Sequence, residues 1–184
     1  FGTVNPSGKL PFTFPVKIED SPAHALGAYT CGSDVKYEEG IYVGYRWFED
    51  RDIKPLFAFG HGLSYTEFEY SDFKASKTVS AEGVLKASVK VKNVGSREGK
   101  EVVQLYVGEH NPLLDRPVKE LKAFDKVSLA LGETKTVSFE IPASDLAYFN
   151  EEKHEWVLDA AHDFTVYFAA ASDDVRGTVN FMTK

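Results

Sequence analysis

The chain has 184 residues, enough for one large domain or for one domain of about 100 to 150 residues with a further segment attached. Hydrophobic residues make up 43% of the chain, and the surplus of phenylalanine and tyrosine (14 and 9 residues) favours β structure. The formal net charge of -7, with no basic stripe, argues against nucleic acid as a partner. No apolar run approaches the ~18 residues that a spanning helix needs, so we expect no membrane partner.

Cysteine and histidine usage limits the kinds of site that the chain can hold. Cys31 is the single cysteine, which excludes an internal disulfide and a thiolate zinc cluster, and we expect an inert or partly buried thiol rather than a redox or nucleophilic one. The five histidines lie far apart without an i,i+4 pair. We therefore predict no metal site, and we expect no cofactor.

Glycine and proline punctuate residues 1–72 irregularly, and no full set of alternating strands can be counted there. Two short extended pieces are predicted, PSGKLPFTFP at residues 6–15 and the aromatic-rich EEGIYVGYRWFED at residues 38–50. The segment has too little periodic apolar surface to fold alone. Because the chain opens directly on FGTVNPSGKLP, without a start methionine, we expect this segment to be the tail of a preceding domain.

Acidic clusters in this segment and near the C-terminus are interpreted as solvated. The pair at residues 38–39 is expected where a strand begins, with a polar contact near a neighbouring active site as the alternative. Glu49, Asp50 and Asp52 interleave with basic residues, which predicts a solvated turn with weak surface ion pairs. The pair at residues 173–174 is expected to form a turn.

The aromatic residues can pack or can stack on sugars, and both interpretations are kept. Tyr42, Tyr45, Trp47 and Phe48 are expected to pack the seam between two domains, while a ligand contact by Trp47 stays open. Trp156 is expected in the core or at the edge of a sandwich rather than on a carbohydrate platform.

Residues 55–68 (PLFAFGHGLSYTEF) are interpreted as a junction. Pro55 stiffens its start, and Gly60 and Gly62 permit backbone angles that a side chain would forbid. His61 is expected to reach a backbone carbonyl, with substrate contact as the alternative. Five apolar side chains are expected to plug the seam: Phe57, Phe59, Leu63, Tyr65 and Phe68.

From about residue 73 the chain consists of short alternating runs separated by turn residues. The cleanest run is residues 84–95, in which Leu85, Ala87, Val89 and Val91 alternate with polar residues. Recurrence every ~8 to 15 residues, without a helix-length segment, predicts an antiparallel β-sandwich. Further strands are expected at residues 100–110, 118–129, 131–142 and 162–172. One helical turn at 142–149, which Ser144 could cap, is expected to carry the chain between sheets.

Seven blocks of this sequence together carry a family resemblance, and they cover nearly the whole chain: NPSGKLPFTFP, YEEGIYVGYRWFE, PLFAFGHGLSYTEFEYS, GKEVVQLYV, RPVKELKAFDKV, GETKTVSFEI and FTVYFAAASDDVR. In order and spacing they resemble the C-terminal third of bacterial glycoside hydrolase family 3 enzymes of the β-glucosidase type. In that family a (β/α)8 barrel is followed by an α/β sandwich domain and a fibronectin type III-like β-sandwich.

The resemblance implies a mainly β chain with three parts. Residues 1–54 would be the C-terminal remnant of the α/β sandwich domain, and residues 55–70 a linker or junction. Residues 71–184 would be the fibronectin type III-like (immunoglobulin-like) antiparallel β-sandwich.

The resemblance also implies where the chemistry lies. Retaining glycosidases use two carboxyl groups about 5 to 5.5 Å apart. In the family the nucleophile is an Asp of the barrel, and the acid/base is a Glu earlier in the second domain. Neither motif occurs in this chain, so no catalytic residue is assigned and the chain alone is expected to be inactive. Trp47 and His61 are weak candidates for substrate contact.

The leading interpretation is the C-terminal part of a retaining β-glucosidase that hydrolyses terminal β-D-glucosyl residues. Its expected partners are the N-terminal catalytic domains of the same enzyme and, through them, a β-glucoside, with a homo-oligomer left open. The alternatives are a carbohydrate-binding or an oligomerisation β-sandwich module. We favour the bacterial cytoplasm as location and leave a periplasmic or secreted one open.

Overall fold

The computed structural model describes residues 2–29, 32 and 34–184. Cys31 lies outside the described residues, so the expectation for its thiol stays a prediction. None of the described helices is both long and apolar enough to cross a membrane.

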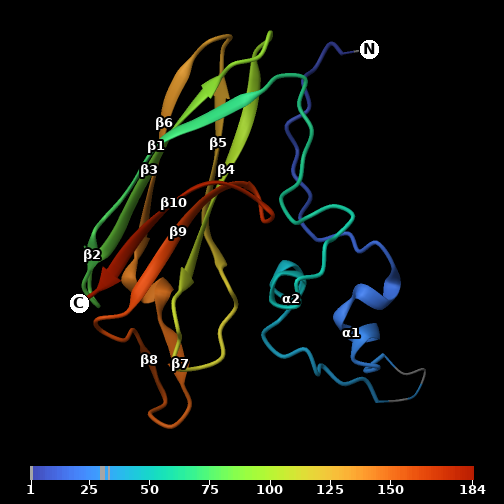
Figure 1. The fold of residues 1–184 in the computed structure, drawn as a ribbon, viewed down its shortest axis with the longest axis vertical. Coiled ribbons are helices and arrows are strands. Elements are labelled where there is room, and N and C mark those ends of the chain that lie inside the picture. Colours follow the sequence, from blue (N-terminus) through green and yellow to red (C-terminus); the bar gives the residue numbers. More distant parts are fainter. Residues whose placement is uncertain (1, 30–31, 33) are drawn as a thin grey trace.

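Residues from Phe68 onward form a sandwich of two sheets (Figure 1). The smaller sheet has the strand order β1-β3-β6, and the larger has the order β2-β10-β9-β4-β5. Neighbouring strands are antiparallel except β2 and β10. The predicted antiparallel β-sandwich is therefore confirmed. The strand bounds are β1 Phe68–Ala75, β2 Thr78–Val79, β3 Val84–Asn93, β4 Gly99–Glu109, β5 Glu120–Leu129, β6 Thr134–Pro142, β9 Asp163–Ala171 and β10 Asp174–Thr183.

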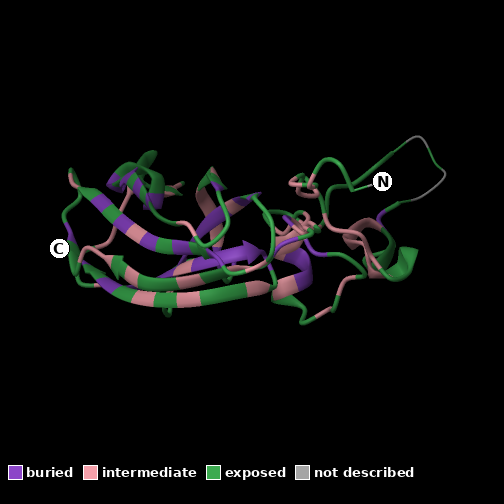
Figure 2. Ribbon diagram, turned by 90° about the horizontal axis from the view of Figure 1, so that it is seen from above, coloured by how far each residue is buried: buried purple, intermediate pink, exposed green. Residues whose placement is uncertain are grey.

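The main core lies between the two sheets and is built from alternate residues of their strands. Leu85, Val89 and Val91 of β3 are fully buried, whereas the lysines between them are exposed. Val103 and Leu105 of β4 are buried in the same core. Figure 2 shows this alternation of buried and exposed positions along the strands. The period-2 pattern of the sequence thus identified the core face correctly.

A 3-10 turn, η2 (Ala143–Leu146), follows β6, and a small hairpin of β7 (Tyr148–Asn150) and β8 (Glu155–Val157) comes next. In Figure 1 the hairpin projects from one end of the sandwich. The predicted helical turn is confirmed, but the predicted cap is wrong. Pro142 occupies the N-cap position, and Ser144 lies inside the turn. Leu146, the last residue of the turn, is fully buried.

Residues 2–67, where described, form an irregular layer beside the sandwich, which we call the N-terminal layer (Figure 1). It contains η1 (Ile18–Asp20), α1 (Pro22–Ala25), α2 (Tyr45–Asp50) and an isolated β-bridge between Phe14 and Phe57. The expected lack of a strand set in this region is confirmed among the described residues.

The extended piece predicted at residues 38–50 is wrong, because residues 45–50 form α2. Gly44, with φ of 61°, turns the chain just before the helix. Trp47 and Phe48 follow each other and are both buried. Adjacent residues of a strand point to opposite faces, whereas a helical turn can bury both against one neighbour.

Candidate functional site

The face of β4 that points away from the main core is also buried, although such a face ordinarily meets solvent. Gln104 and Tyr106 lie on it and are 3% and 0% exposed. The Tyr45 ring of α2 packs edge-on against Tyr106, with 5.6 Å between centroids, and lies 5.2 Å from the Phe59 ring. The N-terminal layer therefore covers the larger sheet through an aromatic seam.

Gln104 connects the two parts by hydrogen bonds inside this seam. Its Nε2 donates to the carbonyl oxygens of Gly60 at 3.2 Å and Ala170 at 2.7 Å, and the Tyr106 hydroxyl donates to its Oε1 at 2.6 Å. Gly60 has φ of +80°, and a Cβ there would lie 2.7 Å from Cδ of Gln104. The predicted need for an unusual backbone angle is thus confirmed at Gly60.

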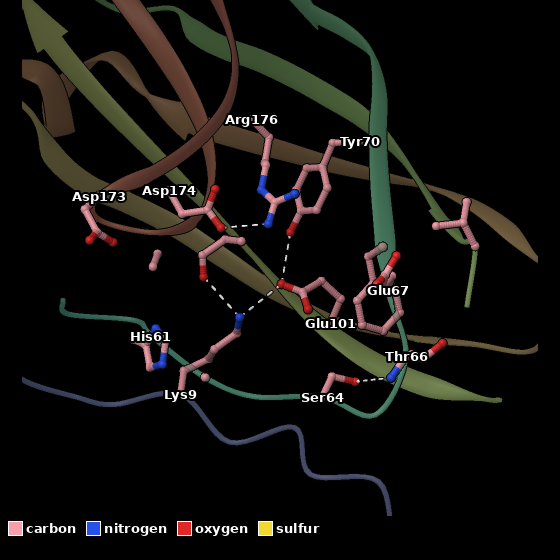
Figure 3. A pocket seen from close by; sticks show the side chains of 15 residues that line it. Lys9, His61, Ser64, Thr66, Glu67, Tyr70, Glu101, Asp173, Asp174 and Arg176 are labelled. Atoms are coloured by element: carbon pink, nitrogen blue, oxygen red, sulfur yellow. Dashed lines mark hydrogen bonds and ion pairs between the residues drawn. The ribbon is translucent and has the colours of Figure 1, made fainter. Parts of the chain in front are cut away.

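A cavity of about 430 Å³ lies beside the seam, between the N-terminal layer and strands of both sheets (Figure 3). Lys9 Nζ reaches up to Glu101 Oε1 at 3.1 Å, and the Tyr70 hydroxyl donates to the same oxygen at 3.1 Å. Arg176 lies over the Tyr70 ring and pairs with Asp174 at 2.7 Å. Burial, followed by the Glu101 carboxylate, raises the pKa of Tyr70, so its hydroxyl stays a donor.

Two more ion pairs connect α2 with the chain around the start of β5. Lys119 forms a close pair with the mostly buried Glu49, and burial raises the pKa of Glu49 although Lys119 opposes this. Arg46 lies 2.9 Å from Glu120 Oε1. Burial acts to raise the pKa of Glu120, but its three cationic neighbours outweigh burial and hold that pKa below its usual value.

These polar groups cross-link the two sides of the seam. A retaining glycosidase needs two carboxyl groups on either side of the scissile bond. In the seam, Glu101, Glu49 and Glu120 each pair with a cation from the other side of the seam. Charge-assisted hydrogen bonds of this kind hold surfaces together and fix their relative register.

Trp47 and His61, the two weak candidates for substrate contact, lie in different surroundings. Trp47 is 4% exposed, its Nε1 donates to the carbonyl of Asp20 at 3.0 Å, and Arg51 lies over its ring at 4.9 Å. His61 is half-buried at the Figure 3 cavity, and its ring lies 5.2 Å from the Phe57 ring. Within the described part of the chain the His61 ring makes no hydrogen bond to a backbone carbonyl, so this expected contact is not found, and the ring packs on Phe57.

The seam is plugged by fewer junction side chains than the sequence predicts. Phe59 and Phe68 are partly buried, whereas Phe57, Leu63 and Tyr65 are exposed, which corrects the expectation for these three. The bulk of the seam comes from α2 instead. Gly62 is needed because the backbone at Gly8 approaches it closely, and not because of its own backbone dihedral angle. A Cβ at position 62 would collide with the carbonyl oxygen of Gly8.

The acidic clusters also differ in part from expectation. Glu49 is mostly buried against Lys119, so the solvated interpretation is wrong for it, since α2 turns this side chain toward the sandwich. The pair at 38–39 lies in a turn rather than where a strand begins. The turn expected at 173–174 is confirmed at Asp173, and β10 starts at Asp174.

Trp156 is 70% exposed and lies on a separate two-stranded sheet, so the expected place in the core or at the edge of the sandwich is wrong. It lies on β8 of the projecting hairpin, opposite Phe149 of β7, with 5.7 Å between the ring centroids. The hairpin forms a sheet of two strands.

One cluster brings metal-ligand side chains together, although histidine spacing predicted no such site. Donor atoms of Glu109, Asp159 and His162 lie within 4.8 Å of one another. Arg116 already pairs with Glu109 at 2.7 Å, and the Tyr148 hydroxyl donates to Asp159 at 3.0 Å. The cluster is a polar contact between the end of β4 and the loop after β8. Asp159 and His162 are three positions apart, whereas Glu109 is 53 positions from His162, and this distant member could not be predicted from sequence spacing.

Comparison with known proteins agrees with the fold. The family model for the fibronectin type III-like domain matches residues 101–172. The chain is 47% identical over 184 residues to β-glucosidase BoGH3A of Bacteroides ovatus, covering 98% of this chain and 24% of that protein. It is 47% identical over 176 residues to thermostable β-glucosidase B of Acetivibrio thermocellus, covering 95% and 23%.

Solved structures agree as well. β-Glucosidase 3B of Thermotoga neapolitana, in complex with α-D-glucose, superposes with a TM-score of 0.88 and 40% identity, covering 98% of this chain and 25% of that one. The GH3 β-glucosidase of Bifidobacterium adolescentis gives 0.91 and 33% identity, covering 100% and 27%. The chain spans about a quarter of the length of these relatives. It therefore corresponds to the C-terminal region of glycoside hydrolase family 3 β-glucosidases, with their fibronectin type III-like domain.

Proposed function

We propose that this chain is the non-catalytic C-terminal part of a retaining β-glucosidase, and that it stabilises the catalytic domains of the same enzyme. The observation that carries the proposal is the buried seam, which fixes the N-terminal layer on the sandwich, together with the apolar surface that the layer leaves open. The layer is then the element between the sandwich and the rest of the enzyme.

The open surface of the N-terminal layer supports this role. More than half of the exposed large apolar side chains among the described residues lie in the first 65 of 184 positions. Exposed apolar side chains concentrated in one part of a chain favour a contact with another protein or domain. The relatives are about four times as long as this chain, so they have polypeptide to cover it. The exposed side chains include Phe12, Val16, Ile18, Tyr29, Tyr37 and Val43.

We further propose the domain division at residues 1–54, 55–70 and 71–184, with β1 extending the sandwich back to Phe68. The junction then contains Gly60, whose carbonyl accepts from Gln104 of the sandwich. In this scheme Trp47 and His61 act in packing rather than in substrate contact. Trp47 supports this because its indole is bound and covered within the layer.

The substrate would be a β-glucoside with a terminal β-D-glucosyl residue, since the relatives above are named β-glucosidases. Its cleavage would take place in the domains that the relatives possess beyond this region. The carboxylates of the seam would contribute stability only.

Reconstitution tests the proposal. The purified chain is mixed at micromolar concentration with the separately produced remainder of the enzyme, and hydrolysis of p-nitrophenyl β-D-glucoside is followed together with complex mass. We expect no hydrolysis by the chain alone, and a one-to-one complex with recovered activity. Hydrolysis by the pure chain, or failure to associate or to restore activity, would contradict the proposal.

A further inference from the structure

The hairpin of β7 and β8 projects from one end of the sandwich (Figure 1). Two of its aromatic side chains, Trp156 and Phe149, are exposed. Trp156 and Phe149 are a cross-strand pair whose rings meet at 68°, so Phe149 supports the indole without forming a flat platform with it. Neither residue belongs to the main core. The two rings together form an exposed aromatic surface, which is a suitable contact for the apolar face of a ligand.

A cavity of about 670 Å³ lies next to Trp156. Small-molecule sites typically occupy about 300 to 1,000 Å³. The other walls come from β5 and η2, and they supply the Asp145 carboxylate, the Ser144 hydroxyl and the Lys122 ammonium. Asp145 and Ser144 are exposed, and the Ser144 hydroxyl donates a long hydrogen bond of 3.5 Å to Asp145 Oδ1. One aromatic face and several hydrogen-bonding groups match a pyranose ring, which has an apolar C–H face and a rim of hydroxyls.

The base of the hairpin is held in place, so the site is largely preformed. Leu146 is fully buried, and its carbonyl accepts from Arg116 Nη2 at 3.1 Å. The Tyr148 hydroxyl donates to Asp159 Oδ2 at 3.0 Å across the hairpin base. A ligand that stacks on Trp156 therefore needs to order little of the protein, which limits the entropic cost of binding.

We propose that the cavity beside Trp156 binds a β-linked gluco-oligosaccharide. Trp156 stacks on one glucose ring, and Asp145 accepts hydrogen bonds from its hydroxyls. All ring substituents of β-linked glucose are equatorial, which leaves both faces apolar and suited to stacking. The choice of β-linked glucose rests on the proposed function, whereas the stacking site rests on the exposure of Trp156 and the polar walls beside it. The site would hold the enzyme near a β-linked gluco-oligosaccharide.

Tryptophan fluorescence tests the site directly, because the chain has only 2 tryptophans. Trp47 is buried, so acrylamide quenching reports mainly on Trp156. Cellopentaose should protect Trp156 from acrylamide in a saturable manner, and Trp156→Phe should abolish the ligand-dependent change. By calorimetry, Trp156→Ala should weaken cellopentaose binding at least about tenfold, and Asp145→Ala about threefold to tenfold, if one stacking contact and one hydrogen bond are lost.

Phe124→Ala is the matched control, because Phe124 is an exposed aromatic residue of β5 that does not line this cavity. It should leave the affinity unchanged. Circular dichroism should show that Trp156→Ala keeps the fold, since the side chain lies outside the core. Absence of protection by cellopentaose, or equal affinity of wild type and Trp156→Ala, would overturn the proposal. Equal binding of maltopentaose would overturn the choice of β-linkage. The assay contains no catalytic domain, so its failure is distinct from failure of reconstitution.

Discussion

Gly60 lies directly against the side chain of Gln104, and the two residues share a hydrogen bond from Gln104 Nε2 to the Gly60 carbonyl. This contact joins the junction to the buried outer face of β4. Because the amide of Gln104 also bonds Ala170 and Tyr106, it cannot move aside without breaking buried hydrogen bonds. The seam therefore depends on a residue without a side chain at position 60.

Gly60→Ala should destabilise the chain by about 3 kcal/mol, because it combines an unfavourable backbone angle with a collision in a packed seam. Gly132→Ala is the matched control, since Gly132 has φ of +72° but no atom within 4 Å of the place that a Cβ would take. It should cost only about 1 kcal/mol. Urea denaturation measures both. Equal losses of unfolding free energy for the two variants would show that the contact with Gln104 does not add to the cost of Gly60→Ala.

Glu101→Gln tests the ion pair that Figure 3 shows. The substitution leaves the partly buried Lys9 ammonium without its counter-charge, and we expect a loss of about 2 to 3 kcal/mol. Glu140→Gln removes one partner of the exposed pair with Lys86 and should change stability by less than about 1 kcal/mol. If chemical denaturation gives the same small loss for both, the pair at Lys9 contributes no more than a surface pair.

Glu120 should make stability depend on pH in the acid range. Its pKa is lowered in the folded chain, so its stabilising contribution is present above the unfolded value near 4.5 and is lost as pH falls through the folded pKa. The stability difference between wild type and Glu120→Gln should be constant near neutral pH and should shrink in acid. Denaturation curves across this range measure it. A difference that grows as the pH falls contradicts this assignment.

The sequence predicts features that depend on local periodicity, and it misses those that depend on distant partners. The alternation around Val89 identified the sandwich and its core face. The burial of Gln104 could not be predicted, because its cover comes from residues more than 40 positions earlier. The same holds for the Lys9–Glu101 pair, which spans 92 positions. The one available signal for a buried outer face was that β4 has apolar residues on both faces, such as Leu105 on one and Tyr106 on the other.

Two other differences have local causes. Helix α2 has six residues, too few for a helical period to stand out from an aromatic run. Trp156 was expected in the core or at the edge of the sandwich, but it lies on a separate two-stranded hairpin and is 70% exposed. In both cases tertiary context decided the outcome.

The central claim is that the open apolar surface of the N-terminal layer docks on the rest of the enzyme, and one substitution measured in two settings tests it. Ile18 is exposed in this chain. Ile18→Asp should leave the melting temperature of the isolated chain unchanged, and should lower that of the full enzyme by several degrees with loss of activity. Leu131→Asp, at an exposed turn of the sandwich, is the control and should change neither. A full enzyme that tolerates Ile18→Asp as well as Leu131→Asp would contradict the account.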